Sequence, residues 1–157
     1  MGLRAGLFLA ILVLFLDQVS KLAILEWVQP QAAGIAITGF LAIVLVWNRG
    51  MSFGMFNVGD PIVPWILGAI ALAVAVGLVW WLARAHRWIV VAGLGLVLGG
   101  AVGNLIDRLL YGAVVDFVLL HAGGWHFPAF NVADSAITLG VIALLWDSLF
   151  TKPESPK

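Results

Sequence analysis

The sequence predicts an all-α membrane protein of four transmembrane helices, with a small β-sheet cradle on the non-cytoplasmic side between the first two helices. Of the 157 residues, 63% are hydrophobic and only 10% are charged, whereas soluble domains are about half apolar. The mean hydropathy is +1.11. Four apolar stretches also approach the ~20 residues that a helix needs to cross ~30 Å of hydrocarbon.

The four spanning stretches are residues 5–27, 61–83, 88–111 and 131–150. Aromatic residues mark their ends, as is typical where amphipathic rings lie at the headgroup level. These are Trp27, Trp65, Trp80, Trp81, Trp88, Tyr111 and Trp146. The helices and their loops use nearly the whole length, so we expect a single domain over residues 1–157 with a disordered tail at 152–157.

A fifth apolar run, residues 35–47, is too short to span a membrane. It is rich in β-branched residues and is bracketed by Gly34 and by the turn-like Asn48, Arg49 and Gly50. We therefore expect strands over about residues 34–56, continuing through 51–56, that form a sheet against the membrane surface.

Basic residues predict the orientation, because cytoplasmic loops carry an excess of Lys and Arg. In the four-helix topology one side carries Arg4, Arg84, Arg87, Lys152 and Lys157, and the other carries only Arg49. Both termini are therefore expected in the cytoplasm. The first apolar run continues past Asp17 to Trp27 without a small-residue cleavage site, which disfavours a cleavable signal peptide.

Composition excludes several kinds of chemistry. The chain has no cysteine, so it has no disulfide, thiolate metal site, cysteine nucleophile or lipidated cysteine of its own. The formal net charge is zero, and no basic face predicts a nucleic-acid partner.

Ionisable residues gather in the outward halves of the helices. They are Asp17, Lys21, Asp107, Arg108, Asp116 and Asp134, accompanied by Asn104. Charged groups within a membrane cost about 2.5–3.5 kcal/mol each even on insertion scales, so they are expected to face a polar interior and to mark function. The polar zone lies on one side of the membrane only.

The sequence spacing of these ionisable residues indicates a structural role for some of them and leaves the role of others open. Asp17 and Lys21 share one helix face at i, i+4, and we favour a structural role for them as an ion pair that locks the first helix to the third. Asp134 has its own structural interpretation in the first turn of a helix capped by Asn131. Asp116 could be a solvated loop acid just beyond the third helix. Spacing alone leaves both alternatives open.

Several short blocks of this sequence together resemble the signal peptidase II family of prolipoprotein signal peptidases. The blocks are DQVSK at 17–21, NRGMSFG at 48–54, GGAVGNLIDR at 99–108, VDF at 115–117 and FNVAD at 130–134. The resemblance is specific because the blocks occur in order on a four-helix chain. It does not extend to residues 119–128, where we expect a lid over the site.

The resemblance implies an aspartic endopeptidase with Asp116 and Asp134 as its catalytic pair. It further implies substrate-binding roles for Asn48, Gly50, Asn104, Arg108 and Asn131, and a supporting polar network of Asp17, Lys21 and Asp107. Two close carboxyls share one proton and divide the roles of acid and base, so no metal or cofactor is expected.

The implied partner is a prolipoprotein with a diacylglyceryl-modified cysteine, held among membrane lipids. The resemblance also implies a monomeric, multi-pass protein of the bacterial inner membrane with its active site near the outer leaflet. Inhibition by globomycin-type lipopeptides is a further implication. Acyl chains anchored at the depth of the acids would position the scissile bond.

Three alternatives remain open at this stage. A serine protease could use Ser20, Ser52 or Ser135 with Lys21 as base, although adjacent Ser20 and Lys21 point about 100° apart on a helix. A proton-coupled transporter would need a polar path to both faces, yet residues 61–83 contain no ionisable group. A metal site could combine His121 and His126 with the two aspartates, although His-x4-His is not a standard helical ligand spacing.

Overall fold

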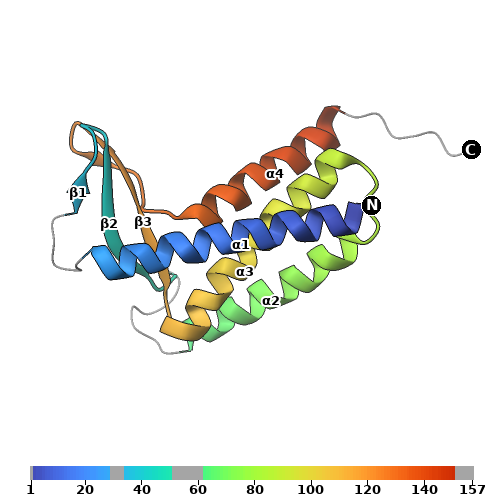
Figure 1. Cartoon of the computed structure of the whole chain (residues 1–157), viewed down its shortest axis with the longest axis horizontal. Helices are drawn as coiled ribbons and strands as arrows, with labels where there is room; N and C mark the ends of the chain where they lie inside the picture. Colours follow the sequence, from blue (N-terminus) through green and yellow to red (C-terminus); the bar gives the residue numbers. More distant parts are fainter. Residues whose placement is uncertain (1, 29–33, 51–61, 151–157) are drawn as a thin grey trace, which may run out of the picture.

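The computed structural model describes residues 2–28, 34–50 and 62–150 and contains the expected helices (Figure 1). They are α1 (Gly2–Trp27), α2 (Val63–Leu82), α3 (Trp88–Tyr111) and α4 (Val132–Phe150). All four are long and apolar enough to cross a membrane, which confirms the prediction with small shifts at the ends. The expected strand at 51–56, the helix start at 61 and the tail at 152–157 lie outside the described residues.

Helix α3 is the central element of the bundle. In its spanning window 56% of residues are buried, against 22% or less in the other three helices. Glycines allow this close packing. A Cβ on Gly99 would lie 2.5 Å from the carbonyl oxygen of Ala10 in α1, and one on Gly100 would lie 2.5 Å from that of Ala133 in α4. Small residues let membrane helices approach closely, so α1 and α4 pack against two faces of α3.

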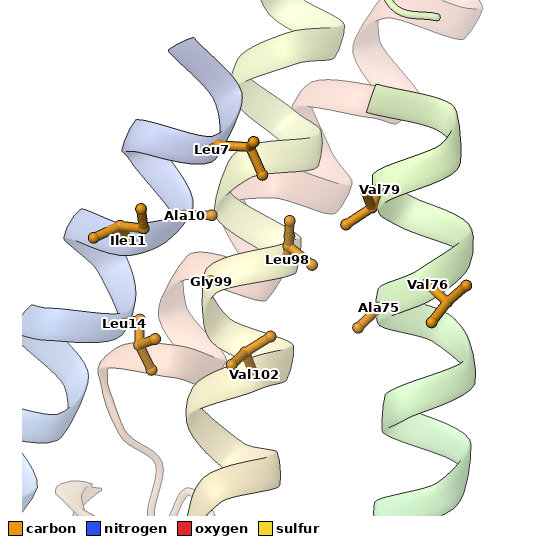
Figure 2. Close-up of a pocket in the computed structure, with 10 residues that line it drawn as sticks. All are labelled: Leu7, Ala10, Ile11, Leu14, Ala75, Val76, Val79, Leu98, Gly99 and Val102. Atoms are coloured by element: carbon orange, nitrogen blue, oxygen red, sulfur yellow. The ribbon is translucent and has the colours of Figure 1, made fainter. Parts of the chain in front are cut away.

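Helix α2 packs on α3 and leaves an apolar crevice between itself and α1 (Figure 2). The crevice has a volume of about 430 Å³. Side chains from the three helices line it: Leu7, Ala10, Ile11, Leu14, Ala75, Val76, Val79, Leu98, Gly99 and Val102. This lining offers no polar path through the middle of the described bundle, which disfavours the transporter alternative.

The sheet has four antiparallel strands in the order β1-β2-β3-β4. Strands β1 (Ile35–Ala36) and β2 (Leu41–Asn48) come from the segment where strands were expected. Strands β3 (Val114–Ala122) and β4 (Trp125–His126) come from the segment after α3. Most of residues 119–128, where a lid over the site was expected, are paired within the sheet, and the covering role stays a prediction.

The sheet lies at one end of the bundle, where α1 and α3 end and α4 begins (Figure 1). The N-terminus and the α2 to α3 connection lie at the opposite end. The polar residues of α1, α3 and α4 therefore meet beneath the sheet, and this junction holds the candidate site.

Candidate active site

Asp116 is a buried strand residue, not the solvated loop acid considered from spacing. It pairs with Val46 of β2 and is 1% exposed. The side-chain amide of Asn48 donates to its Oδ2 at 2.9 Å, and that of Asn131 donates to its Oδ1 at 2.8 Å. Burial raises the pKa of Asp116 to about 6; the charge of Asp134 also raises it, and the two amide hydrogen bonds lower it.

Asp134 lies in the first turn of α4 and takes part in a reciprocal cap. The Asp134 N–H donates to Asn131 Oδ1 at 2.9 Å, and the Asn131 N–H donates to Asp134 Oδ2 at 3.3 Å. This is the geometry of a capping box. The other oxygen, Asp134 Oδ1, accepts from Asn104 Nδ2 at 2.8 Å. Asp134 therefore lies in the first turn of a helix capped by Asn131, as the spacing predicted. Its carboxyl is half-buried and lies at the edge of a groove.

Asn131 joins the two acids. Its side-chain amide binds Asp116 while its backbone N–H binds Asp134, and the residue itself is fully buried. The two carboxyls, 18 positions apart in the sequence, are therefore held on either side of one residue. They lie close enough for the charge of Asp134 to act on Asp116.

Both acids border open space on the sheet side of α4. A groove of about 690 Å³ is lined by Asp134, and an adjoining one of about 380 Å³ by Asp116. The two grooves share Asn48, Pro128 and Ala129. The larger one also has apolar walls, formed by Leu120, Trp125, Phe127, Phe130 and Leu139. An elongated, mainly apolar ligand could thus reach both carboxyls.

Lys21 is the centre of a buried ion cluster beneath the two acids. Its Nζ lies 2.8 Å from Asp17 Oδ2 and 2.8 Å from Asp107 Oδ2, with all three side chains at most 3% exposed. The same ammonium donates to Asn104 Oδ1 at 3.0 Å. A compact ammonium can satisfy three acceptors at once, so Lys21 links α1 to α3 as the i, i+4 spacing predicted.

The carboxylates of this cluster reach further than spacing could show. Asp17 Oδ1 accepts the Ala133 N–H of α4 at 2.9 Å, where the helix dipole favours an anion. Asp107 Oδ2 accepts the N–H of Val115 at 3.0 Å, one residue before Asp116. The cluster therefore holds the two segments that carry the candidate acids.

Asn48 and Gly50 form a turn at the end of β2. Asn48 Oδ1 accepts the Gly50 N–H at 2.9 Å, which orients its amide nitrogen toward Asp116. Gly50 has φ of 86°, a conformation that glycine adopts without steric cost. Arg108 donates to the Asn104 carbonyl at 3.1 Å and lies within the field of Asp107, Asp116 and Asp134.

Sequence reasoning missed two members of the cluster. Gln18 Nε2 lies 3.2 Å from Asp17 Oδ2 and 3.1 Å from Asp107 Oδ1, so it spans the two carboxylates that Lys21 neutralises. Gly103 provides space, because a Cβ there would lie 2.5 Å from Asp17 Oδ2. The position of Gln18 next to Asp17 was the available signal.

The alternatives with other nucleophiles or metals find little support in the described residues. Lys21 is engaged by two carboxylates, and the Ser20 hydroxyl donates to the Asp17 carbonyl at 2.8 Å. Ser52 lies outside the described part of the chain. Among residues 2–28, 34–50 and 62–150, no group of three or more His, Asp or Glu side chains is arranged to hold a metal ion.

Four spanning helices, with two carboxyls that border adjoining grooves, fit a membrane-embedded aspartic peptidase. The family follows from sequence: residues 9–150 match the Peptidase_A8 model, described as Signal peptidase (SPase) II. The chain belongs to this signal peptidase II family and is a multi-pass membrane protein.

Relatives agree with this assignment over nearly the whole chain. The chain is 49% identical to a lipoprotein signal peptidase of Methylobacterium radiotolerans, covering 93% of this chain and 86% of the relative. It is 44% identical to one of Burkholderia multivorans, covering 94% and 89%. It also resembles a bacterial membrane enzyme solved by the in meso method at 1.9 Å resolution, with TM-score 0.80, 30% identity and 94% coverage of both chains.

Proposed function

We propose that this chain removes the signal peptide from diacylglyceryl-modified prolipoproteins, with Asp116 and Asp134 activating the attacking water. The observation that carries the proposal is the pair of carboxyls held by Asn131 at two adjoining grooves. The named activity of the relatives supports the substrate class. The proposal extends that activity to particular residues of this chain.

We assign the shared proton of the pair to Asp116, which is the more deeply buried of the two acids. Burial raises the pKa of Asp116 to about 6. Asp134 lies in the first turn of α4 and accepts two N–H hydrogen bonds, as Asp116 does. In this assignment Asp134 is the base and Asp116 the acid.

Hydrolysis then needs no covalent intermediate. Asp134 takes a proton from the water molecule as the water oxygen attacks the scissile carbonyl carbon. At the same time Asp116 gives its proton to the carbonyl oxygen. The resulting gem-diol collapses when its C–N bond breaks. Asp134, which now carries the proton from water, supplies a proton to the leaving nitrogen. The pair regains its single proton when one carboxyl takes back the proton of the gem-diol hydroxyl.

Polar residues around the acids position them and the substrate. Asn48, Asn104 and Asn131 donate directly to the carboxyls, and Gly50 fixes the turn that orients Asn48. Arg108 lies in the same electrostatic field and supplies a cation for substrate carbonyls. The cluster centred on Lys21 holds these groups from beneath.

The apolar walls of the groove suit the lipid part of the substrate. Leu120, Phe127 and Leu139 line the same space as Asp134, so acyl chains could lie against them while the peptide passes the acids. Anchoring both partners in one leaflet raises the effective concentration of the scissile bond. The distribution of basic residues supports cytoplasmic termini, and with that orientation the site would lie near the outer leaflet. We further propose one domain and a monomer.

Cleavage by matched Asp→Asn variants tests the proposal. A diacylglyceryl-modified precursor would be incubated in detergent with wild-type protein, Asp116→Asn and Asp134→Asn. Asn is nearly isosteric but cannot exchange the proton, so both variants should lose activity by about 10²–10⁴-fold. Asp147→Asn is the control, because Asp147 binds Arg87 near the far end of α4. Full activity in either site variant would exclude the dyad.

A further inference from the structure

The outer end of the sheet brings two histidines side by side on a tight hairpin. His121 of β3 is registered with His126 of β4, and their ring centroids are 6.0 Å apart with the planes tilted by 30°. Residues directly opposite on antiparallel strands project from the same face. Neither histidine takes part in the proposed hydrolysis.

The hairpin backbone fixes this pair. The connecting residues Gly123 and Gly124 have φ of 56° and 85°, as a two-residue type I′ turn requires. The Phe127 N–H donates to the Leu120 carbonyl at 2.8 Å, so the histidines occupy the neighbouring non-hydrogen-bonded position. Opposed side chains approach most closely at such positions, and the imidazoles are therefore preorganised.

We propose that His121 and His126 form a binding site for a divalent transition metal of the Zn²⁺, Ni²⁺ or Cu²⁺ type, completed by water. Imidazole is a preferred ligand of these ions. With Zn–N bonds of about 2.1 Å, two imidazole centroids on one tetrahedral ion lie roughly 5.2 Å apart. The observed separation of the two ring centroids, 6.0 Å, is close to that distance.

The site is separate from the carboxyls. Side chains alternate between the two faces along a strand, and Leu120, Trp125 and Phe127 line the groove that contains Asp134. His121 and His126 therefore project from the opposite face of the hairpin. A metal ion bound there would act as a clamp that links β3 to β4 on the face opposite the groove. The clamp would make this wall of the groove more rigid, and the ion would not enter the groove.

Zinc titration of protein purified without a polyhistidine tag tests the site directly. Calorimetry would compare wild type with His121→Asn and His126→Asn, using His86→Asn as the matched control, since His86 is the only other histidine. Loss of either ligand should weaken Zn²⁺ binding by at least about tenfold, since losing even an outer partner of a ligand costs roughly that much. The control should bind like wild type. Equal binding by all four proteins would overturn the proposal.

Two further readouts identify the ligands and the clamp. Cu²⁺ paramagnetic resonance of wild type should show coupling to two imidazole nitrogens, and to one in either single variant. Amide hydrogen exchange of residues 118–127 should slow when Zn²⁺ is added to wild type, but not when it is added to a double variant that carries both His121→Asn and His126→Asn. Binding without such slowing would contradict the clamp. These readouts do not depend on cleavage, so they stand apart from the proposed peptidase mechanism.

Discussion

Replacing Lys21 by methionine should destabilise the protein more than removing any exposed cation. The substitution keeps the length of the side chain but removes the ammonium that lies 2.8 Å from both Asp17 and Asp107. Removing one partner of a buried ion pair costs about 3–5 kcal/mol, because a buried charge remains uncompensated. Here two carboxylates lose their partner at once, so we expect a free energy of unfolding lower by at least about 3 kcal/mol.

Arg87→Met provides the comparison. Arg87 also pairs with an aspartate at 2.9 Å, but its side chain is 46% exposed. Although its partner Asp147 is only 11% exposed, solvent reaches the guanidinium, so this pair should contribute less than the fully buried contacts of Lys21. Equilibrium unfolding in mixed micelles, followed by circular dichroism, would give both values. If Lys21→Met costs no more than Arg87→Met, the cluster does not have the energetic role assigned to it.

A neutral version of the cluster separates charge from packing. The triple variant Asp17→Asn, Lys21→Met, Asp107→Asn removes every buried charge of the cluster, and each asparagine can still accept a backbone N–H through its Oδ1. Buried ion pairs can be replaced by neutral groups at little cost, so the triple variant should be more stable than Lys21→Met alone. A triple variant less stable than the single one would contradict this explanation.

Three further predictions concern the acids and the packing beneath them. Because the pKa of Asp116 is raised from 3.8 to about 6, kcat/KM should fall as pH rises through about 6 and the shared proton is lost. Between pH 3.8 and about 6 the folded state holds the proton of Asp116 more tightly than the unfolded state, so the contribution of Asp116 to the free energy of unfolding should decrease as pH rises through this range. Asp116→Asn should remove this pH dependence. Asn48→Ala removes a donor that lowers the pKa of Asp116. The alkaline limb of the variant's pH–rate profile should therefore move to higher pH. A limb at the wild-type position would argue against the contact between Asn48 and Asp116. Gly103→Ala places a Cβ 2.5 Å from a buried carboxylate and should lower the free energy of unfolding by about 1–3 kcal/mol. Gly77→Ala is the control, because nothing in the described structure lies within 4 Å of the added Cβ. In thermal unfolding this control should be neutral or stabilising by up to about 1 kcal/mol.

The helices were predictable because the bilayer imposes their length. Each spanning run needs about 20 apolar residues, so composition alone placed α1, α3 and α4 close to their observed ends. The strands in residues 35–48 were also visible, since a β-branched run of that length cannot span. Both signals are local, and they survive in a single sequence.

Half of the sheet was missed for a physical reason. Residues 114–117 at the start of β3 are all buried, so this segment lacks the alternation of polar and apolar residues that marks a half-exposed strand. Its partner, β2, lies more than 60 positions earlier. Such pairing depends on contacts that no local pattern encodes.

The candidate site shows the same division between local and long-range information. The i, i+4 spacing of Asp17 and Lys21 predicted their ion pair, and Asn131 was correctly expected to cap α4. Spacing could not show that Asn131 also binds Asp116, or that Asp17 binds the N-terminus of α4. These contacts join segments far apart in sequence, and they hold the two acids at adjoining grooves.

The central claim is that Asp116 and Asp134 act as one unit on a single water, and a double-mutant comparison of kcat/KM tests it most directly. Asp116→Asn, Asp134→Asn and the double variant would be assayed on one diacylglyceryl-modified precursor. Residues that act together are strongly non-additive. The account predicts a double variant no worse than the weaker single variant, and losses that multiply in the double variant would contradict it.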